Sequence, residues 1–326
     1  MHGKHLHPAV GIIGLGMVGA PLKRYFEEWK GYVREEDLFL FDIDPAKGFE
    51  DDMGRADVVF VSVPTPRSLS GEADLSAVRS SFGRIKGSGK IMVIKSTVPP
   101  GTTEMFQREF PQHKVLFNPE FLTESRAWED FVKPDRQIVG FTEGSVDAAH
   151  LVLSLLPKAP FMSPWGLGTY RPIKITATEA ELIKYGGNVY FARKVAFANT
   201  LSSLAEHHGA NYENVRLGVS ADYRIGDSHL DVHHGGYRGF GGYCLVKDLD
   251  AYISALERAG LAGEAALLRS DRIFNTELLL SQGLTPEDVS VHDGEWIRRK
   301  LERSRAVPSN ALSSSLQEET SEAPHA

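Results

Sequence analysis

The single cysteine of the chain, Cys244, stands behind five glycines and ahead of two charged residues. The stretch reads HHGGYRGFGGYCLVKDLDAY over residues 233–252, with Lys247 and Asp248 following the thiol. If a helix begins near Cys244, its dipole and unpaired N–H groups favour the thiolate, and Asp248 lies one turn further along. This stretch alone is consistent both with a nucleophile and with the inert, buried role of many isolated cysteines.

A second set of polar residues lies on a long helix that we predict over residues 178–208. Thr178-x-x-Glu181 is a capping-box pattern for the start of this helix. Lys184 and Asn188 are four residues apart, so they share one helical face and can be aimed at a ligand. Apolar residues at helical spacing predict a core or dimer element, and they are Leu182, Tyr185, Val189, Ala192, Ala196, Leu201 and Leu204.

Three glycines follow a short apolar strand at residues 10–13 and precede a predicted helix at residues 20–29. Gly14 permits a tight turn, Gly16 lets the backbone approach a pyrophosphate, and Gly19 allows the helix to pack closely on the strand. This order of elements predicts a dinucleotide site at the helix N-terminus. Its predicted cofactor-binding residues are Gly14, Gly16, Met17, Val18 and Gly19.

An acidic residue, Asp42, follows the second predicted strand at residues 38–41 and lies 23 residues beyond Gly19. At this distance from the glycine turn, a carboxylate accepts a hydrogen bond from the ribose 2′-OH and disfavours a 2′-phosphate. The predicted cofactor is therefore NAD.

Four further apolar runs predict strands, with helix-compatible stretches between most of them. They lie at residues 57–63, 90–95, 114–117 and 137–141. Apolar strands that alternate with helices indicate an α/β fold, a Rossmann doubly wound parallel sheet with its ligand at the carboxyl ends of the strands. The loops at those ends carry the other predicted site residues, Pro64, Thr65, Thr97, Glu120, Phe121, Leu122 and Glu124.

Composition and charge narrow the class of protein. A chain of 326 residues with 42% hydrophobic content is long enough for two domains with separate cores. The net charge of −7, without a Lys/Arg-rich stretch, argues against nucleic acid as a partner. With one cysteine, no signal-peptide h-region and no run of about 18 apolar residues, we expect a cytoplasmic protein without a membrane span. The paired histidines at 207–208 and 233–234 are poorly spaced for a metal, so no metal site is predicted.

A series of motifs over about residues 9–280 resembles the UDP-glucose/GDP-mannose dehydrogenase family. The motifs are GLGMVGAPL, ADVVFVSVPTP, KSTVPPGTT, FNPEFLTES, KPDRQIVG, ELIKYGGNVYFARKVAFAN, RIG and GFGGYCLVKD. The resemblance implies an NAD-binding Rossmann domain at residues 1–165 and an all-helical dimerisation and substrate domain with the cysteine loop at residues 166–283. A short helix and a disordered end would occupy residues 284–326, and the 178–208 helix would form a homodimer.

The resemblance also implies a reaction. Family members oxidise the C6 alcohol of a nucleotide sugar to a carboxylate, a precursor of polysaccharides, by two hydride transfers to two NAD+. The carbon passes through a thiohemiacetal and a thioester on one cysteine, whose position Cys244 occupies. Lys184 would stabilise the oxyanion, Asn188 would orient it, and Asp248 would position or deprotonate the water or the reacting hydroxyl.

Other residues match the family's active site in the same way. Thr97, Glu120 and Glu124 match the remaining residues of that active site. Glu120 would be the general base, and Glu124 would lie nearer the cofactor. Arg224 matches an arginine that reaches the substrate across the dimer interface. The implied substrate-binding residues are Glu120, Phe121, Leu122, Lys184, Asn188, Arg224, Phe240 and Gly241.

The sequence departs from the family pattern in three places. Near its end it offers a short helix around residues 296–303 and a Ser/Glu/Ala-rich stretch, where the family normally has a third, nucleotide-fold domain. Fourteen residues lie between Asp42 and Asp57, where the family has a longer helix and an extra strand. Leu245 and Val246 replace an aromatic residue and a proline.

Two other functions are consistent with the same residues. A β-hydroxyacid-type dehydrogenase shares the nucleotide fold and a lysine/asparagine pair, but it removes one hydride and has no use for Cys244. A dimeric protein that binds NAD without turnover is the second. For Arg136 of the PDRQ motif, an ion pair in the sheet and a contact with the cofactor are equally open.

Overall fold

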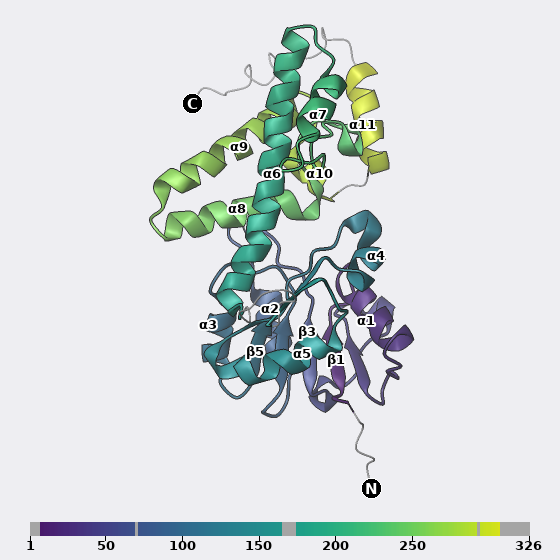
Figure 1. Cartoon of the computed structure of the whole chain (residues 1–326). Helices are drawn as coiled ribbons and strands as arrows, with labels where there is room; N and C mark the ends of the chain where they lie inside the picture. The colour runs from purple at the N-terminus through teal and green to yellow at the C-terminus, as the bar shows by residue number, and fades with distance from the viewer. Residues whose placement is uncertain (1–6, 69–70, 165–173, 292–293, 307–326) are drawn as a thin grey trace, which may run out of the picture. The chain divides into compact units, whose positions relative to one another are not determined.

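The computed structural model describes residues 7–68, 71–164, 174–291 and 294–306 of the chain. These residues divide into two compact units between Gly187 and Asn188, which we describe separately (Figure 1). The predicted domain limits at residues 165 and 283 stay a prediction.

The first unit is built on a six-stranded sheet with the order β2-β1-β3-β4-β5-β7. Five strands are parallel, as the apolar runs predict. They are β1 (Val10–Ile13), β2 (Leu38–Phe41), β3 (Val58–Val61), β4 (Ile91–Ile94) and β5 (Lys114–Phe117). Helices follow most of these strands, which confirms the α/β fold.

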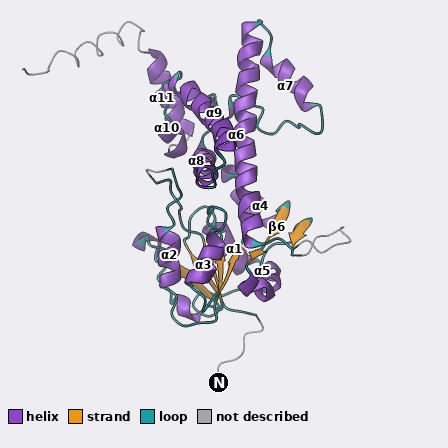
Figure 2. Ribbon diagram, turned by 90° about the vertical axis from the view of Figure 1, so that its left-hand side faces the viewer, coloured by secondary structure: helices purple, strands orange, loops and turns teal. Residues whose placement is uncertain are grey.

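Helices cover both faces of this sheet (Figures 1 and 2). Alternate strand residues such as Ile12 and Phe60 pack on one face against α1 (Gly19–Glu28), α4 (Ala127–Val132) and α5 (Ala149–Leu155). The residues that follow them, Ile13 and Val61, pack on the other face against α2 (Ser76–Gly83) and α3 (Thr102–Glu109). The strands are therefore buried on both faces of the sheet. In such a sheet, a ligand binds at the carboxyl ends of the strands.

The predicted strand at residues 137–141 is wrong as a single parallel strand. Its first part is β6 (Arg136–Ile138), which pairs with β8 (Phe161–Ser163) in a separate two-stranded sheet. Its second part is β7 (Gly140–Phe141), which runs antiparallel to β5. The change of sheet occurs where Gly140 packs tightly, because a Cβ there would lie 2.7 Å from the Ala180 Cβ and 2.8 Å from the Thr176 carbonyl oxygen.

A long helix, α6 (Ala177–His207), begins in the first unit and continues into the second. The predicted capping box is wrong by two residues, since Thr176 and Glu179 exchange the capping hydrogen bonds. Glu181 has a different partner. Its buried carboxylate accepts hydrogen bonds from the backbone N–H groups of Gly101 and Thr103, at 2.6 and 2.7 Å, and so ties α6 to the start of α3.

The described residues of the second unit form the rest of α6 and five further α-helices. They are α7 (Tyr212–Ser220), α8 (Gly242–Arg258), α9 (Ala262–Leu280), α10 (Pro286–Val291) and α11 (Gly294–Ala306). Apolar residues of α6, α8 and α9, such as Ala192, Leu249 and Leu268, share one core. The helix predicted around residues 296–303 lies within α11.

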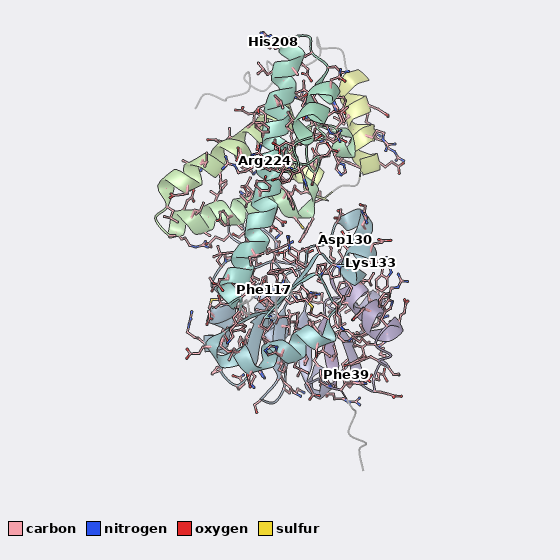
Figure 3. The ribbon with its side chains drawn as sticks, viewed as in Figure 1. Phe39, Phe117, Asp130, Lys133, His208 and Arg224 are labelled. Atoms are coloured by element: carbon pink, nitrogen blue, oxygen red, sulfur yellow. The ribbon has the colours of Figure 1, made fainter. Side chains whose placement is uncertain are left out.

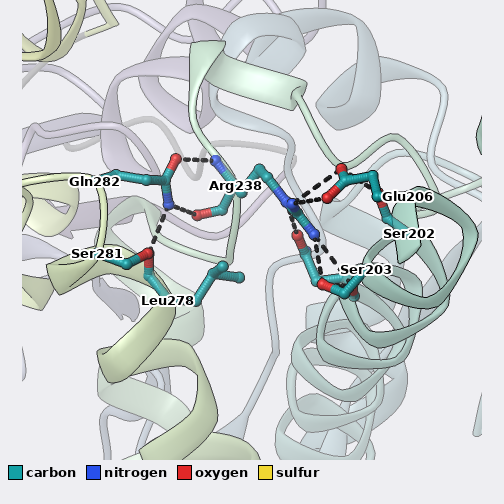
Figure 4. Close-up of polar contacts among 8 residues, drawn as sticks. Ser202, Ser203, Glu206, Arg238, Leu278, Ser281 and Gln282 are labelled. Carbon is teal, nitrogen blue, oxygen red and sulfur yellow. Dashed lines mark hydrogen bonds and ion pairs between the residues drawn. The ribbon is translucent and has the colours of Figure 1, made fainter. Parts of the chain in front are cut away.

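The segment before α8 is fixed by Arg238 (Figure 4). Its guanidinium donates to Asn199 and Ser203 of α6 and pairs with Glu206, and its backbone N–H and C=O both bond to the side chain of Gln282. The chain that leads to Cys244 is therefore anchored on two sides.

The Ser/Glu/Ala-rich end, predicted to be disordered, lies outside the described residues. Within the described ranges, no helix is both long enough and apolar enough to span a bilayer.

Candidate functional site

The glycine turn after β1 has the geometry that the sequence predicts. Gly14 has a φ of +88°, and a Cβ there would lie 2.4 Å from the carbonyl oxygen of Ser62. A Cβ on Gly19, the first residue of α1, would lie 1.8 Å from the Gly14 oxygen, whereas one on Gly16 would meet nothing within 4 Å. Gly14 and Gly19 are thus required by the protein's own packing, and Gly16 leaves open space for a ligand.

Asp42, at the end of β2, holds this turn in place. Its Oδ2 accepts hydrogen bonds from the Leu15 backbone N–H at 2.7 Å and from Lys47 Nζ at 2.8 Å, and its Oδ1 accepts one from the Asp44 N–H. Burial opposes ionisation of Asp42, but these donors outweigh it, so the pKa lies below its ordinary value. An ionised acceptor therefore lies beside the turn, which fits the ribose of a dinucleotide. The neighbouring Met17 is exposed.

The loops that follow β3 and β4 are joined to each other. Thr65 is buried, and its hydroxyl donates to the Thr97 carbonyl at 2.7 Å, while the Ser96 hydroxyl donates to the Val63 carbonyl at 2.7 Å. Pro64 is exposed and Thr97 is half-buried. Contact of Pro64, Thr65 or Thr97 with a cofactor stays a prediction.

Glu120 and Lys184 form a buried ion pair in the first unit. Lys184 Nζ lies 2.7 Å from Glu120 Oε1, and the other carboxylate oxygen of Glu120 accepts the Leu122 N–H at 2.7 Å. Burial favours the neutral acid, yet the charge and hydrogen bond of Lys184, with smaller help from Leu122 and Lys95, lower the pKa of Glu120. Glu120 is therefore a carboxylate able to accept a proton. Glu124, in contrast, is exposed on η3 (Glu124–Arg126).

Phe121 lies beside this pair and carries a cation on its ring. The Arg136 guanidinium carbon is 3.9 Å from the ring centroid, and Lys184 Nζ is 5.8 Å from it. Among the described residues, Arg136 forms no ion pair, so the first of its two predicted roles is not realised there. Leu122 is half-buried, like Phe121.

The second unit gathers three of the predicted residues at the start of α8. Cys244 is the third residue of the helix and is partly exposed, which confirms its predicted place at a helix N-terminus. Asp248, one turn later, is fully buried and accepts hydrogen bonds from Asn188 Nδ2 at 2.6 Å and from Lys247 Nζ at 2.5 Å. The carboxylate is thus held between an amide and an ammonium group, one turn from the thiol.

The remaining predicted residues of the second unit do not join this cluster. Phe240 is buried in the core, and its backbone N–H and C=O both bond to the Asn275 side chain. A Cβ on Gly241 would lie 2.2 Å from the Tyr237 hydroxyl, so this glycine is required by packing. Arg224, which is labelled in Figure 3, has an exposed side chain. Its guanidinium pairs with Asp222 at 2.5 Å. Substrate contacts of Phe240, Gly241 and Arg224 stay predictions.

Sequence reasoning missed two buried polar residues, Lys95 and Asn118. Each directly follows an apolar strand, and their side chains are hydrogen-bonded at 2.6 Å. A polar residue at the carboxyl end of a buried strand is a signal that was available for both. Over the described part of the chain, no three His, Cys, Asp or Glu side chains are grouped to hold a metal ion.

The fold and these residues define a class. A glycine turn after β1, an ionised acid after β2 and a helical second unit are the architecture of NAD-dependent oxidoreductases with a Rossmann domain. Comparison with known proteins makes this specific. The model of the "UDP-glucose/GDP-mannose dehydrogenase family, NAD binding domain" matches residues 45–153, and that of the family's central domain matches residues 178–277. The chain belongs to the UDP-glucose/GDP-mannose dehydrogenase family, as the resemblance implies, and NAD is the cofactor of the matched domain.

Individual relatives agree with this assignment. The chain is 34% identical to the UDP-glucose 6-dehydrogenase of Rickettsia bellii over 258 residues, which are 74% of this chain and 57% of that protein. It is 37% identical to the Pseudomonas aeruginosa enzyme of the same name over 218 residues, 63% of this chain and 46% of the relative. A solved UDP-glucose dehydrogenase from Pyrobaculum islandicum superposes with a TM-score of 0.68 at 29% identity, covering 84% of this chain and 69% of that one. The chain spans about half the length of the curated relatives it matches.

Proposed function

We propose that this chain is an NAD-dependent nucleotide-sugar dehydrogenase that oxidises a primary alcohol to a carboxylate in two hydride transfers. The observation that carries the proposal is Cys244 at the N-terminus of α8, one turn before a fully buried Asp248 held by Asn188 and Lys247. A one-step dehydrogenase has no need of a thiol at this position. The curated relatives from Rickettsia bellii and Pseudomonas aeruginosa are both named UDP-glucose 6-dehydrogenase, which supports a UDP-sugar as substrate.

The first half of the reaction needs a base. NAD+ supplies the hydride acceptor when bound. Glu120 takes the proton of the sugar C6 hydroxyl as the carbon loses hydride, which forms the aldehyde. Its lowered pKa keeps it ionised and ready for this role. Lys184, 2.7 Å from Glu120, carries the positive charge that offsets the developing negative charge on the sugar oxygen.

The second half needs a tetrahedral carbon. The Cys244 thiolate adds to the aldehyde, and the oxyanion of the thiohemiacetal is stabilised by Lys184 and oriented by Asn188. Loss of the second hydride gives a thioester. Water, positioned or deprotonated with the help of Asp248, then cleaves the C–S bond and releases the carboxylate and the thiol.

We also propose a homodimer that uses α6. Three large apolar residues recur every seven positions along this helix and are exposed, Tyr190 at 57%, Phe197 at 56% and Leu204 at 56%. Exposed apolar residues in a row favour a protein interface. Arg224 would then be available to a partner subunit's substrate, as the family resemblance implies.

A screen for NADH release tests the proposed activity. Purified protein is mixed with NAD+ and a panel of UDP-sugars, GDP-sugars and unlinked sugars, and absorbance at the NADH band is followed. We expect turnover with at least one nucleotide sugar and its loss in Cys244→Ser. Identical rates for both proteins on every substrate would remove the thiol from the mechanism, and NAD+ binding without any turnover would favour a non-catalytic protein.

A further inference from the structure

Lys95 is a buried lysine to which the proposed reaction gives no role. It follows β4 directly, is 3% exposed, and donates a hydrogen bond from Nζ to Asn118 Oδ1 at 2.6 Å. Ile94 pairs with Phe117 in the parallel sheet, so Lys95 and Asn118 emerge side by side at the carboxyl edge. Burial of a charged lysine carries a large desolvation cost, so nearby polar partners have to offset that cost.

Asn118 is held in one orientation by partners on a third element. Its Nδ2 donates to Gln137 Oε1 at 2.9 Å and to the Ile138 carbonyl at 2.7 Å, both on β6. With the NH2 group used in this way, the amide oxygen faces Lys95. Glu120 follows Asn118 by two residues, so the same contacts fix the backbone from which Glu120 projects.

The charges near Glu120 are unbalanced, with two lysines acting on one carboxylate. Lys184 of α6 contacts Glu120 directly, and Lys95 lowers its pKa further through its charge. On Lys95 itself, burial lowers the pKa to about 8, Glu120 opposes this and Lys184 adds to it. From β6, the Arg136 guanidinium adds a third cation, stacked on Phe121.

We propose that Lys95 is a positioning residue for Glu120, holding the loop through Asn118 and keeping Glu120 ionised by its positive charge. This inference rests on the proposed function, in which Glu120 takes a proton from the sugar. In this role Lys95 does not touch the reacting atoms. It acts through Asn118 and through its charge.

The pH profile of the reaction separates this role from simple packing. Lys95→Met removes the charge and keeps the length of the side chain, and Lys90→Met makes the same change just before the other end of β4. We expect the acid limb of kcat/KM to move to higher pH in Lys95→Met and to stay in place in Lys90→Met. A profile for Lys95→Met that falls equally at every pH, with an unmoved acid limb, would overturn the proposal.

A second measurement needs neither turnover nor a stable Lys95 variant. In protein labelled with ¹³C at the glutamate carboxyl carbons, Glu120→Gln identifies the Glu120 signal. We expect this signal to titrate below the ordinary glutamate range and to shift again near pH 8, where Lys95 loses its proton. A signal that is flat through pH 8 would contradict the proposal whether or not the protein turns over a sugar. If the signal behaves as expected and no sugar is oxidised, the proposed function fails and the Lys95–Glu120 coupling stands.

Discussion

At the scale of single residues, spacing along the chain predicted roles where the partners are close in sequence. Cys244 and Asp248 are one helical turn apart, and Gly14 and Gly19 flank one turn, so the chemistry of both groups was visible in the sequence. Lys95 and Asn118 are 23 residues apart and meet because β4 and β5 pair in register. That contact depends on the sheet, and no local pattern contains it.

Asp42 has two functions at this scale. Its carboxylate accepts a hydrogen bond from the backbone of the glycine turn, and we expect it to accept one from the ribose of NAD. Removing its carboxylate in Asp42→Ala frees the Leu15 N–H and takes away the acceptor, so we expect NAD+ to bind about tenfold more weakly. Isothermal titration calorimetry with NAD+ measures this. The matched control, Asp44→Ala, removes a nearby exposed carboxylate that caps η1 (Pro45–Lys47) and should change the affinity little. Equal losses in both variants would contradict a specific role for Asp42.

At the scale of elements, the parallel strands were predictable because a buried parallel strand is apolar along its whole length. The change of sheet at Gly140 was not predictable, because it depends on how closely the start of α6 approaches the Gly140 backbone. The capping pattern at Thr178 and Glu181 also misled, because the nearby Thr176 and Glu179 offer the same pattern. Glu181 instead connects α6 to the start of α3, and the spacing of residues within one helix does not reveal such a contact.

Glu181 makes the junction of α6 and α3 sensitive to pH. Burial raises its pKa to about 7, against the hydrogen bonds from Thr103 and Gly101. A carboxyl group whose pKa is higher when folded stabilises fully below its unfolded pKa, and that contribution is lost as pH rises to about 7. We expect the advantage of wild type over Glu181→Gln in the free energy of unfolding to shrink by about 3 kcal/mol between pH 4.5 and pH 8.

Urea unfolding at several pH values measures this difference. The control is Glu179→Gln, which makes the same change at an exposed carboxylate two residues earlier on the same helix. A Glu181→Gln difference that is constant from pH 4.5 to pH 8 would show that Glu181 does not titrate there.

At the scale of the whole molecule, we expect a dimer. Phe197 lies in the middle of the exposed apolar row on α6, and an aspartate there places a charge in the expected interface. We expect Phe197→Asp to sediment as a monomer and to lose turnover if Arg224 serves a partner subunit. Leu267→Asp, at a position of α9 that is 54% exposed, should remain a dimer. Sedimentation velocity measures the oligomeric state of both variants. A dimeric Phe197→Asp would place the interface elsewhere.

In the proposed mechanism one carbon loses two hydrides, and between the two transfers it is bound covalently to Cys244. The most direct measurement is the ratio of NADH formed to carboxylate released from a limiting amount of the sugar identified in the screen. We expect two NADH for each carboxylate in the wild type. We expect Cys244→Ser either to stop at the aldehyde with one NADH or to be inactive. One NADH for each product molecule, with Cys244→Ser equal to wild type, would contradict this mechanism.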